Sequence, residues 1–197
     1  MSNRKANKVK EVTIAHKCTK CGRCCIDRGD ISLTPLDVFN IANFLKMSTK
    51  DFIEKYCIID ELMDVRIKAV GPLNACIFLD STTAEATKCK IYKVRPMACY
   101  LYPLKMYEGI KNAFRIDDAP YCSKSSKKIP VKEFVNAKSD GRYEDECLHI
   151  QKFAYALEMY YSYPTKSEQE MFEYFFYNDS ANEAKKKIDD YLTLITT

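Results

Sequence analysis

Four of the ten cysteines of this 197-residue chain lie within eight residues, from Cys18 to Cys25. Three of them, Cys18, Cys21 and Cys24, follow one another with two residues between each pair. Thiolates at this spacing converge on one point when a tight loop turns them inward, and Gly22 permits such a turn. The pattern is typical of three corners of a bacterial ferredoxin cluster, whose fourth cysteine comes from elsewhere in the chain. Zinc stays open as well, since a zinc site needs two closely paired cysteines and two distant ones.

Cys25 directly follows Cys24, and adjacent residues usually point their side chains apart. We therefore expect these two cysteines to serve different metals, or Cys25 to serve a second site. Four later cysteines would complete a set of eight: Cys76, Cys89, Cys99 and Cys122. Eight thiolates make two four-cysteine sites or one polynuclear assembly, and both arrangements remain open.

The composition indicates which chemistry these cysteines serve. The first ten residues are polar and basic, without the apolar stretch of a secretory signal, so we expect a cytoplasmic protein. Thiols stay reduced in that compartment, which favours metal over disulfides. No apolar run approaches the roughly 20 residues of a membrane helix, so no membrane insertion is expected. The net charge of +4 comes from 31 basic and 27 acidic residues, scattered without a basic stripe. No nucleic-acid partner is therefore expected.

The segments around the cysteines predict short elements. Thr34 and Asp37 form a capping box with Pro35 between them, which predicts a helix start, and a second helix is expected over about residues 50–58. Short apolar runs predict strands or turns near two of the later cysteines, and Pro96 predicts a helical turn that aims Cys99. Residues 104–107 and 112–116 flank Glu108-Gly109 and predict a hairpin.

The last third of the chain predicts helices. Apolar residues recur at spacings of three and four from Tyr143 to Tyr161, and Pro164 ends that pattern. Two further capping boxes are expected, and they pair Thr165 with Glu168 and Ser180 with Glu183.

The predicted fold class is α+β, mostly α. We expect an irregular, metal-stapled cysteine-cluster core with short strands and a hairpin, packed against several helices. Residues 1–10 are expected to form a flexible basic tail, and residues 11–125 a cysteine-cluster metal-binding domain. Residues 126–197 are expected to form a helical region of the same globule.

The chain resembles the YkgJ-type cysteine-cluster proteins, which are described as zinc- or iron-chelating domains. Their pattern begins with CxxCxxCC, continues with Thr-x-x-Asp and Cys-x-Phe-Leu, and then has Cys-x-Ile-Tyr-x-x-Arg-Pro-x-x-Cys, a proline and a lone cysteine. The matching residues here are Cys18 to Cys25, Thr34 and Asp37, Cys76 to Leu79, Cys89 to Cys99, Pro103 and Cys122. Tyr102 stands where the family often has phenylalanine.

The resemblance implies a ligand set and a cofactor. The implied metal ligands are Cys18, Cys21, Cys24, Cys25, Cys76, Cys89, Cys99 and Cys122. An iron–sulfur cluster is the expected cofactor, with 4Fe–4S as its expected form and zinc or iron ions as alternatives. Cys57 and Cys147 lie outside the pattern, and both occupy apolar helical positions where cysteine acts as a small buried hydrophobe.

The sequence also leads to expectations for four residues that are not cysteines. Arg95 either offsets the charge of the thiolates or pairs with a carboxylate, and Tyr92 lies beside it in the motif. His16 precedes Cys18 by two residues and is expected to be an exposed loop residue rather than a ligand. His149 is expected on a polar helix face without a chemical role.

Two functions of different class remain open. The chain has no phosphate-binding glycine loop, no His-Glu-x-x-His motif and, with two histidines, little room for a catalytic triad. This favours a metal-binding or electron-carrying module with a protein partner. The alternative is an S-adenosylmethionine-dependent lysine N-methyltransferase with a protein substrate, since flagellin lysine-N-methylase has a similar cysteine cluster. Catalytic residues cannot be assigned from the sequence.

Overall fold

The computed structural model of the chain describes residues 13–17, 20–27, 31–80, 82, 88–106, 114–116, 123–139 and 142–196. Helices predominate there: α1 Pro35–Phe44, α2 Thr49–Tyr56, α3 Met97–Leu101, α4 Val131–Ser139, α5 Tyr143–Ser162, α6 Glu168–Phe176 and α7 Ala181–Thr196. Two turns are 3-10 helices, η1 Arg23–Cys25 and η2 Tyr92–Val94. The strands are short: β1 Thr13–Lys17, β2 Cys57–Ile59, β3 Val65–Ile67, β4 Ala69–Val70, β5 Ala75–Cys76, β6 Leu104–Met106, β7 Phe114–Ile116 and β8 Ser123–Pro130. The predicted class, α+β and mostly α, is confirmed.

The strands form two-stranded antiparallel pairs. Within the described residues the pairs are β1–β8, β2–β3, β4–β5 and β6–β7. The pair β6–β7 confirms the predicted strands of the hairpin, while its turn, Glu108-Gly109, lies outside the described residues. The pair β1–β8 was not predicted, and it joins segments more than a hundred residues apart, with Lys17 opposite Ser123.

The capping signals before the cysteine-bearing elements are confirmed. Thr34 caps α1, its hydroxyl accepts the Asp37 N–H, and Asp37 accepts the Thr34 N–H in return. Pro35 occupies the first turn, where its missing N–H costs nothing. Pro96 precedes α3 with an extended backbone, as the sequence predicts.

The second helix ends earlier than predicted. α2 stops at Tyr56, and Cys57 begins strand β2, so the helical placement of Cys57 is wrong. The run Cys57-Ile58-Ile59 pairs with β3, and β-branched side chains favour a strand over another helical turn. The predicted burial of Cys57 is confirmed, at 5% exposure.

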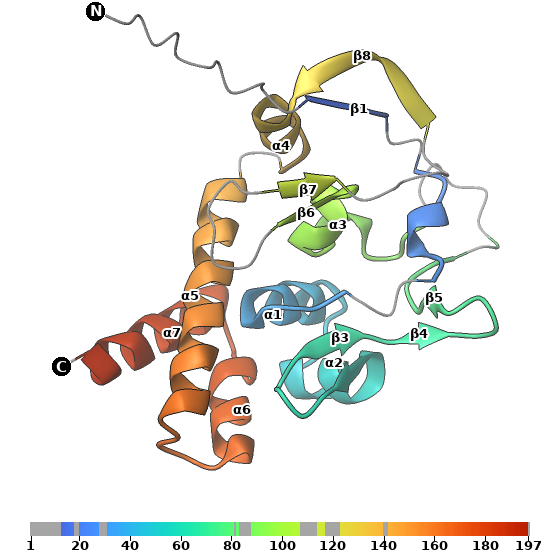
Figure 1. Ribbon diagram of the computed structural model, residues 1–197. Helices are drawn as coiled ribbons and strands as arrows, with labels where there is room; N and C mark the ends of the chain where they lie inside the picture. Colours follow the sequence, from blue (N-terminus) through green and yellow to red (C-terminus); the bar gives the residue numbers. More distant parts are fainter. Residues whose placement is uncertain are drawn as a thin grey trace, which may run out of the picture.

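Two hydrophobic clusters hold the elements together. The larger one unites α1, α2 and β3 with α5, α6 and α7, and it includes Phe52, Phe175 and Phe176. The smaller one unites β1, α3, α4 and the start of α5, and it includes Cys147. Figure 1 shows α5 with α6 and α7 on one side, α1 in the middle, and η1 with β5 on the opposite side. η1 and β5, which carry Cys24, Cys25 and Cys76, therefore lie on the side of the molecule opposite α6 and α7.

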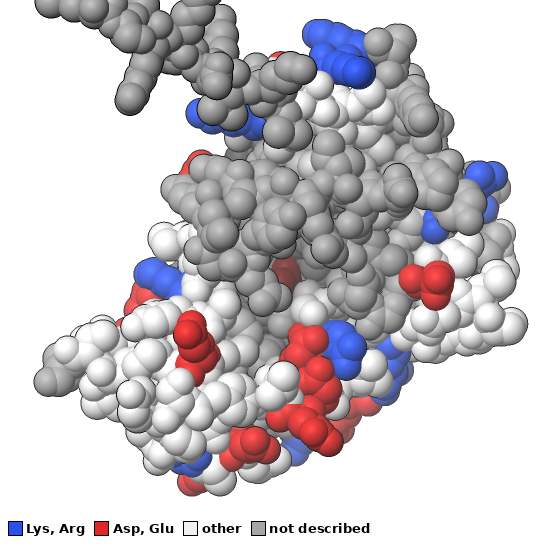
Figure 2. Space-filling view, viewed as in Figure 1, with Lys and Arg blue, Asp and Glu red and all other residues white. Residues whose placement is uncertain are grey.

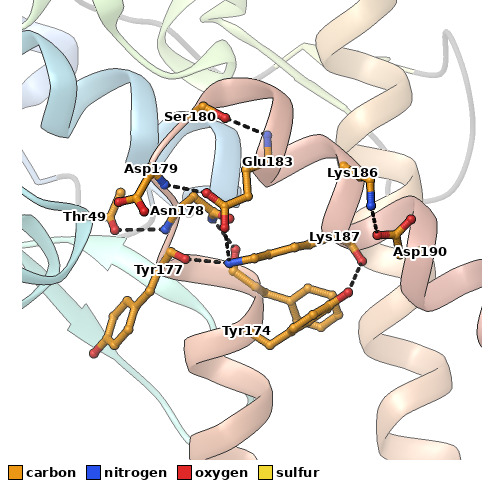
Figure 3. Close-up of polar contacts among 11 residues, drawn as sticks. Thr49, Tyr174, Tyr177, Asn178, Asp179, Ser180, Glu183, Lys186, Lys187 and Asp190 are labelled. Carbon is orange, nitrogen blue, oxygen red and sulfur yellow. Dashed lines mark hydrogen bonds and ion pairs between the residues drawn. The ribbon is translucent and has the colours of Figure 1, made fainter.

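Polar contacts fix the turn between α6 and α7 (Figure 3). Asn178 donates its backbone N–H to the Thr49 hydroxyl at 3.2 Å, which ties this turn to the start of α2. Lys187 donates to the Tyr177 carbonyl at 2.7 Å and pairs with Glu183 at 3.0 Å. These contacts, none of which involves a cysteine, tie the turn between α6 and α7 to the start of α2 and to α7.

The caps of these last helices differ in part from the prediction. The box before α6 pairs Ser167 with Glu170, so the predicted pairing of Thr165 with Glu168 is wrong. Both Thr165-x-x-Glu168 and Ser167-x-x-Glu170 satisfy the pattern, and the helix starts at the second one. Before α7, Ser180 accepts the Glu183 N–H as predicted, but the Glu183 carboxylate accepts the N–H of Asp179.

The surface carries both signs of charge. Basic and acidic side chains are interspersed on the described part of the face in Figure 2. Among the described helices, none has the length and apolarity of a membrane span.

Candidate metal centre

The cysteine run folds as a tight turn at the surface. Cys21 is exposed, Gly22 has φ 76°, and Cys25 donates its N–H to the Gly22 carbonyl at 2.9 Å. The positive φ favours glycine at position 22, and a Cβ there would lie 2.7 Å from Cδ1 of Leu79, so a larger residue would also have to displace the Leu79 side chain. The turn predicted at Gly22 is present, but Cys21, which was expected to point inward, is exposed.

The predicted divergence of Cys24 and Cys25 is wrong. Cys24 is the largest cause of the raised pKa of Cys25, so the two side chains lie close together. Alternation of side chains belongs to extended strands, whereas these residues lie in a 3-10 turn, where successive side chains differ by about 120°. The two thiols therefore face the same region.

Cys76 and Cys89 meet beside the same leucine that contacts Gly22. Leu79 donates its N–H to the Cys76 carbonyl at 2.8 Å and forms a β-bridge with Cys89. This leucine therefore lies where three cysteine-bearing segments come together. Figure 1 shows η1 next to β5, in agreement with these contacts.

The raised pKa values of Cys25 and Cys89 indicate that several cysteines lie near one another. Hydrogen bonding to Cys24, burial, and the nearby Cys99 and Cys76 raise the pKa of Cys25 well above its ordinary value. Burial, Cys76 and Cys24 raise the pKa of Cys89, while the Ile91 N–H and Arg95 act in the opposite direction. Crowded thiols hold their protons unless a cation replaces them, which is the property of a metal site that releases protons on binding.

Five of the eight predicted ligands influence one another's pKa values and so lie in one region of the molecule: Cys24, Cys25, Cys76, Cys89 and Cys99. Cys21 lies at the exposed edge, and Cys18 and Cys122 are outside the described residues. Among the described side chains, no three or more His, Cys, Asp or Glu residues are arranged so that they could hold a metal ion. The fit to a metal therefore lies in the chemistry and gathering of the donors.

Arg95 is held beside these thiols by two aromatic rings. Its guanidinium carbon lies 3.8 Å from the centre of the Tyr92 ring and 3.7 Å from that of Tyr100. Its Nη1 donates to the Tyr92 carbonyl at 2.7 Å. Because Arg95 lowers the pKa of Cys89, the geometry favours the predicted offset of thiolate charge.

The stack continues in both directions beyond Arg95. Lys20 lies 5.3 Å from the centre of the Tyr92 ring, and the Arg142 guanidinium lies 4.3 Å from that of Tyr100. The sequence did not indicate that Tyr100 and Arg142 contribute to this stack. Arg142 is far from the motif along the chain, and no local spacing connects it with Arg95.

We expect Arg95→Leu to weaken zinc binding about 10- to 100-fold, because loss of an outer partner of a metal ligand has an effect of that size. The measurement is competition with a chromophoric chelator. Lys93→Leu is the matched control, since it removes an exposed positive charge two residues away. Equal affinities of the two variants would contradict a specific role for Arg95.

Both histidine predictions need correction. His16 lies in β1, half-buried, with its ring 5.8 Å from that of Phe134 and 6.4 Å from that of Tyr102, so it is not an exposed loop residue. His149 is 5% exposed, and burial lowers its pKa to about 4. The packing of α7 against α5 covers this position, which a one-helix pattern cannot show.

Glu146 is a buried acidic residue near the start of α5. Its carboxylate accepts from Arg142 at 2.7 Å, and burial raises its pKa to about 7, with Asp37 acting in the same direction. The folded protein therefore keeps the Glu146 proton between about pH 4.5 and 7, where the unfolded chain has lost it. The free energy of unfolding consequently falls as the pH rises through that window.

We expect Glu146→Gln to match the wild type at pH 5 and to exceed its free energy of unfolding by about 2 kcal/mol at pH 8. The variant stays neutral at both values, whereas the wild type carries a poorly solvated carboxylate at pH 8. Chemical denaturation at the two pH values measures this difference. Glu144→Gln, on the exposed side of the same helix, should show no such pH dependence. A constant difference between Glu146→Gln and the wild type would exclude the titration of Glu146 as its cause.

Fold and site together define a cysteine-rich metal-binding domain supported by helices. The comparison with protein families agrees: residues 17–147 match the CxxCxxCC family, described as "Putative zinc- or iron-chelating domain". The chain belongs to this family, which supports metal binding as its general function.

One curated relative is the uncharacterized protein MJ0661 of Methanocaldococcus jannaschii, 40% identical over 90 residues. The match covers 46% of this chain and 45% of the relative, so the chain spans less than half the length of that protein. No solved structure matches the chain.

Proposed function

We propose that the cysteine site holds an iron–sulfur cluster, with 4Fe–4S as the expected form, and that the chain acts as a metal-carrying or redox module. The observation that carries this proposal is the gathering of five thiols from four separate segments beside one fixed positive charge. Cys76, Cys89 and Cys99 also pack, partly buried, against the larger hydrophobic cluster. The Cys18-x-x-Cys21-x-x-Cys24 spacing supports a cluster over a single zinc or iron ion.

The proposed ligands are all eight cysteines of the family pattern. The pairing of Lys17 with Ser123 supports the inclusion of Cys18 and Cys122, because it joins their immediate chain neighbours. When bound, a cluster would supply one-electron chemistry. The chain's own groups would hold it and offset its charge: Arg95 by its guanidinium, and the Ile91 N–H by hydrogen bonding to the Cys89 sulfur.

A protein partner belongs to this proposal. A module of this kind exchanges electrons or metal with another protein, and the exposure of Cys21 supports access to the site from the surface. The mixed signs of charge on the described surface give no support to a nucleic-acid partner (Figure 2).

The test is purification without oxygen, followed by measurement of iron, zinc and acid-labile sulfide per chain. Brown protein with iron and sulfide in equal amounts is the expected result. Colourless protein with stoichiometric zinc would indicate a zinc site in place of the proposed cluster. Well-folded protein without any transition metal would overturn both.

A further inference from the structure

Two tyrosine rings and two guanidinium groups form a stack beside the cysteine-bearing turns. The Arg95 guanidinium carbon lies 3.8 Å from the centre of the Tyr92 ring and 3.7 Å from that of Tyr100. The Arg142 guanidinium carbon lies 4.3 Å from the centre of the same Tyr100 ring. Tyr100 therefore contacts both guanidinium groups, and cation–π attraction favours each contact.

The stack joins the segments that carry Cys89 and Cys99. Tyr92 begins η2, and its N–H donates to the Cys89 carbonyl at 3.2 Å. Tyr100 follows Cys99 in α3, and its hydroxyl donates to the Lys93 carbonyl of η2 at 3.0 Å. The position of one cysteine-bearing segment relative to the other therefore depends on how Tyr100 is held.

Arg142 holds Tyr100 from the start of α5. The helix α5 contributes to both hydrophobic clusters, and Tyr100 is a member of the smaller one, with 9% exposure. Glu146, one turn into α5, fixes Arg142 in turn, through an ion pair of 2.7 Å. The guanidinium thus links a buried acidic residue of α5 to the helix that carries Cys99.

We propose that Arg142 is a positioning residue of the metal site, which acts through the ring of Tyr100 on Arg95. Arg95 offsets the charge of the thiolates, and its place depends on the two rings that enclose it. This inference rests on the proposed metal-binding function. It goes beyond that function by giving a role in the site to a residue outside the cysteine motif.

The chain offers Lys185 as a matched control for Arg142. Each is a cation paired with an acidic residue in the first turn of α5, Arg142 with Glu146 and Lys185 with Asp145. Their side chains are 36% and 35% exposed. Lys185 belongs to α7, which Figure 1 shows on the side opposite η1 and β5. Arg142→Leu and Lys185→Leu each break one ion pair, so both are expected to lower the midpoint of chemical unfolding.

Metal binding separates the two variants. The probes are zinc, by chelator competition, and cobalt(II), whose thiolate charge-transfer and ligand-field bands report on coordination geometry. We expect Arg142→Leu to lower zinc affinity about 10-fold, because it acts through other residues, and to change the cobalt spectrum. Lys185→Leu should leave both unchanged. Wild-type values for folded Arg142→Leu, or an equal loss of affinity in both variants, would overturn the inference.

The double variant Arg95→Leu/Arg142→Leu tests the route of the effect. If Arg142 acts through Arg95, the double variant loses no more zinc affinity than Arg95→Leu alone, because the group that Arg142 positions is already absent. A loss equal to the product of the two single losses would show that Arg142 acts independently of Arg95, and would refute the proposed route.

A pair of variants at Tyr100 tests the same stack if Arg142→Leu fails to fold. Tyr100→Phe and Tyr100→Leu both remove the hydroxyl that donates to Lys93, but only leucine removes the ring that the two guanidinium groups contact. Weaker zinc binding in Tyr100→Leu than in Tyr100→Phe is expected, and equal affinities would refute the role of the ring. A wild-type protein that binds neither zinc nor cobalt would instead refute the proposed function.

Discussion

Replacing Cys89 or Cys99 with serine will lower the affinity for metal by more than about 100-fold. This loss is larger than the one expected when a residue that only contacts a metal ligand is removed. A serine hydroxyl is a far weaker ligand for zinc or iron than a thiolate, because it keeps its proton at neutral pH. The measurement is metal content after anaerobic purification, followed by chelator competition for any metal retained.

Cys57→Ala and Cys147→Ala are the controls for that result. Both cysteines are buried in hydrophobic clusters, at 5% and 1% exposure. We expect these variants to keep the metal and to lose about 1–2 kcal/mol of stability from reduced packing. Loss of metal from Cys57→Ala, with full retention in Cys99→Ser, would show that the proposed ligand set is wrong.

Removal of the metal will destabilise the cysteine-bearing segments by an amount on the order of 10 kcal/mol of apparent binding free energy. The effect is large because the described parts of residues 20–27 and 75–101 form only short strands, turns and one short helix. α5, α6 and α7 retain the larger core and the contacts of Figure 3, so they should remain folded.

Hydrogen exchange before and after chelation tests this difference. Faster exchange in β5 and α3, with unchanged protection in α5, is the expected pattern. Unchanged exchange in β5 and α3 would mean that these segments fold without the metal. Equal acceleration in α5 would mean that the metal supports the whole chain rather than one part of it.

Local signals predicted much of the fold. The Thr34–Asp37 box, the proline before α3 and the periodicity of α5 each depend on residues within one or two turns, and each is confirmed. The cap of α6 and the end of α2 were misplaced where two local signals competed. The pairing of β1 with β8 was not predicted, because the sequence of a strand does not indicate which distant segment it pairs with.

The site was predictable in its residue types and less so in its geometry. Cysteine spacing indicated the run up to Cys24 and Cys25, and the family resemblance added Cys76, Cys89 and Cys99, which lie in the same region of the structure. It gave the wrong relation between Cys24 and Cys25, because that relation depends on the turn type. The contact of Arg142 with Tyr100 depends on how the start of α5 packs near α3, which no single segment encodes.

The pairing of Lys17 with Ser123 has a consequence for the order of folding. It closes a chain loop of more than a hundred residues, and that loop contains α1, α2 and α3. Closing so long a loop is entropically costly and slow, whereas α5, α6 and α7 are joined by short connections and can form first. The metal would then bind late in folding, after α5, α6 and α7 have formed.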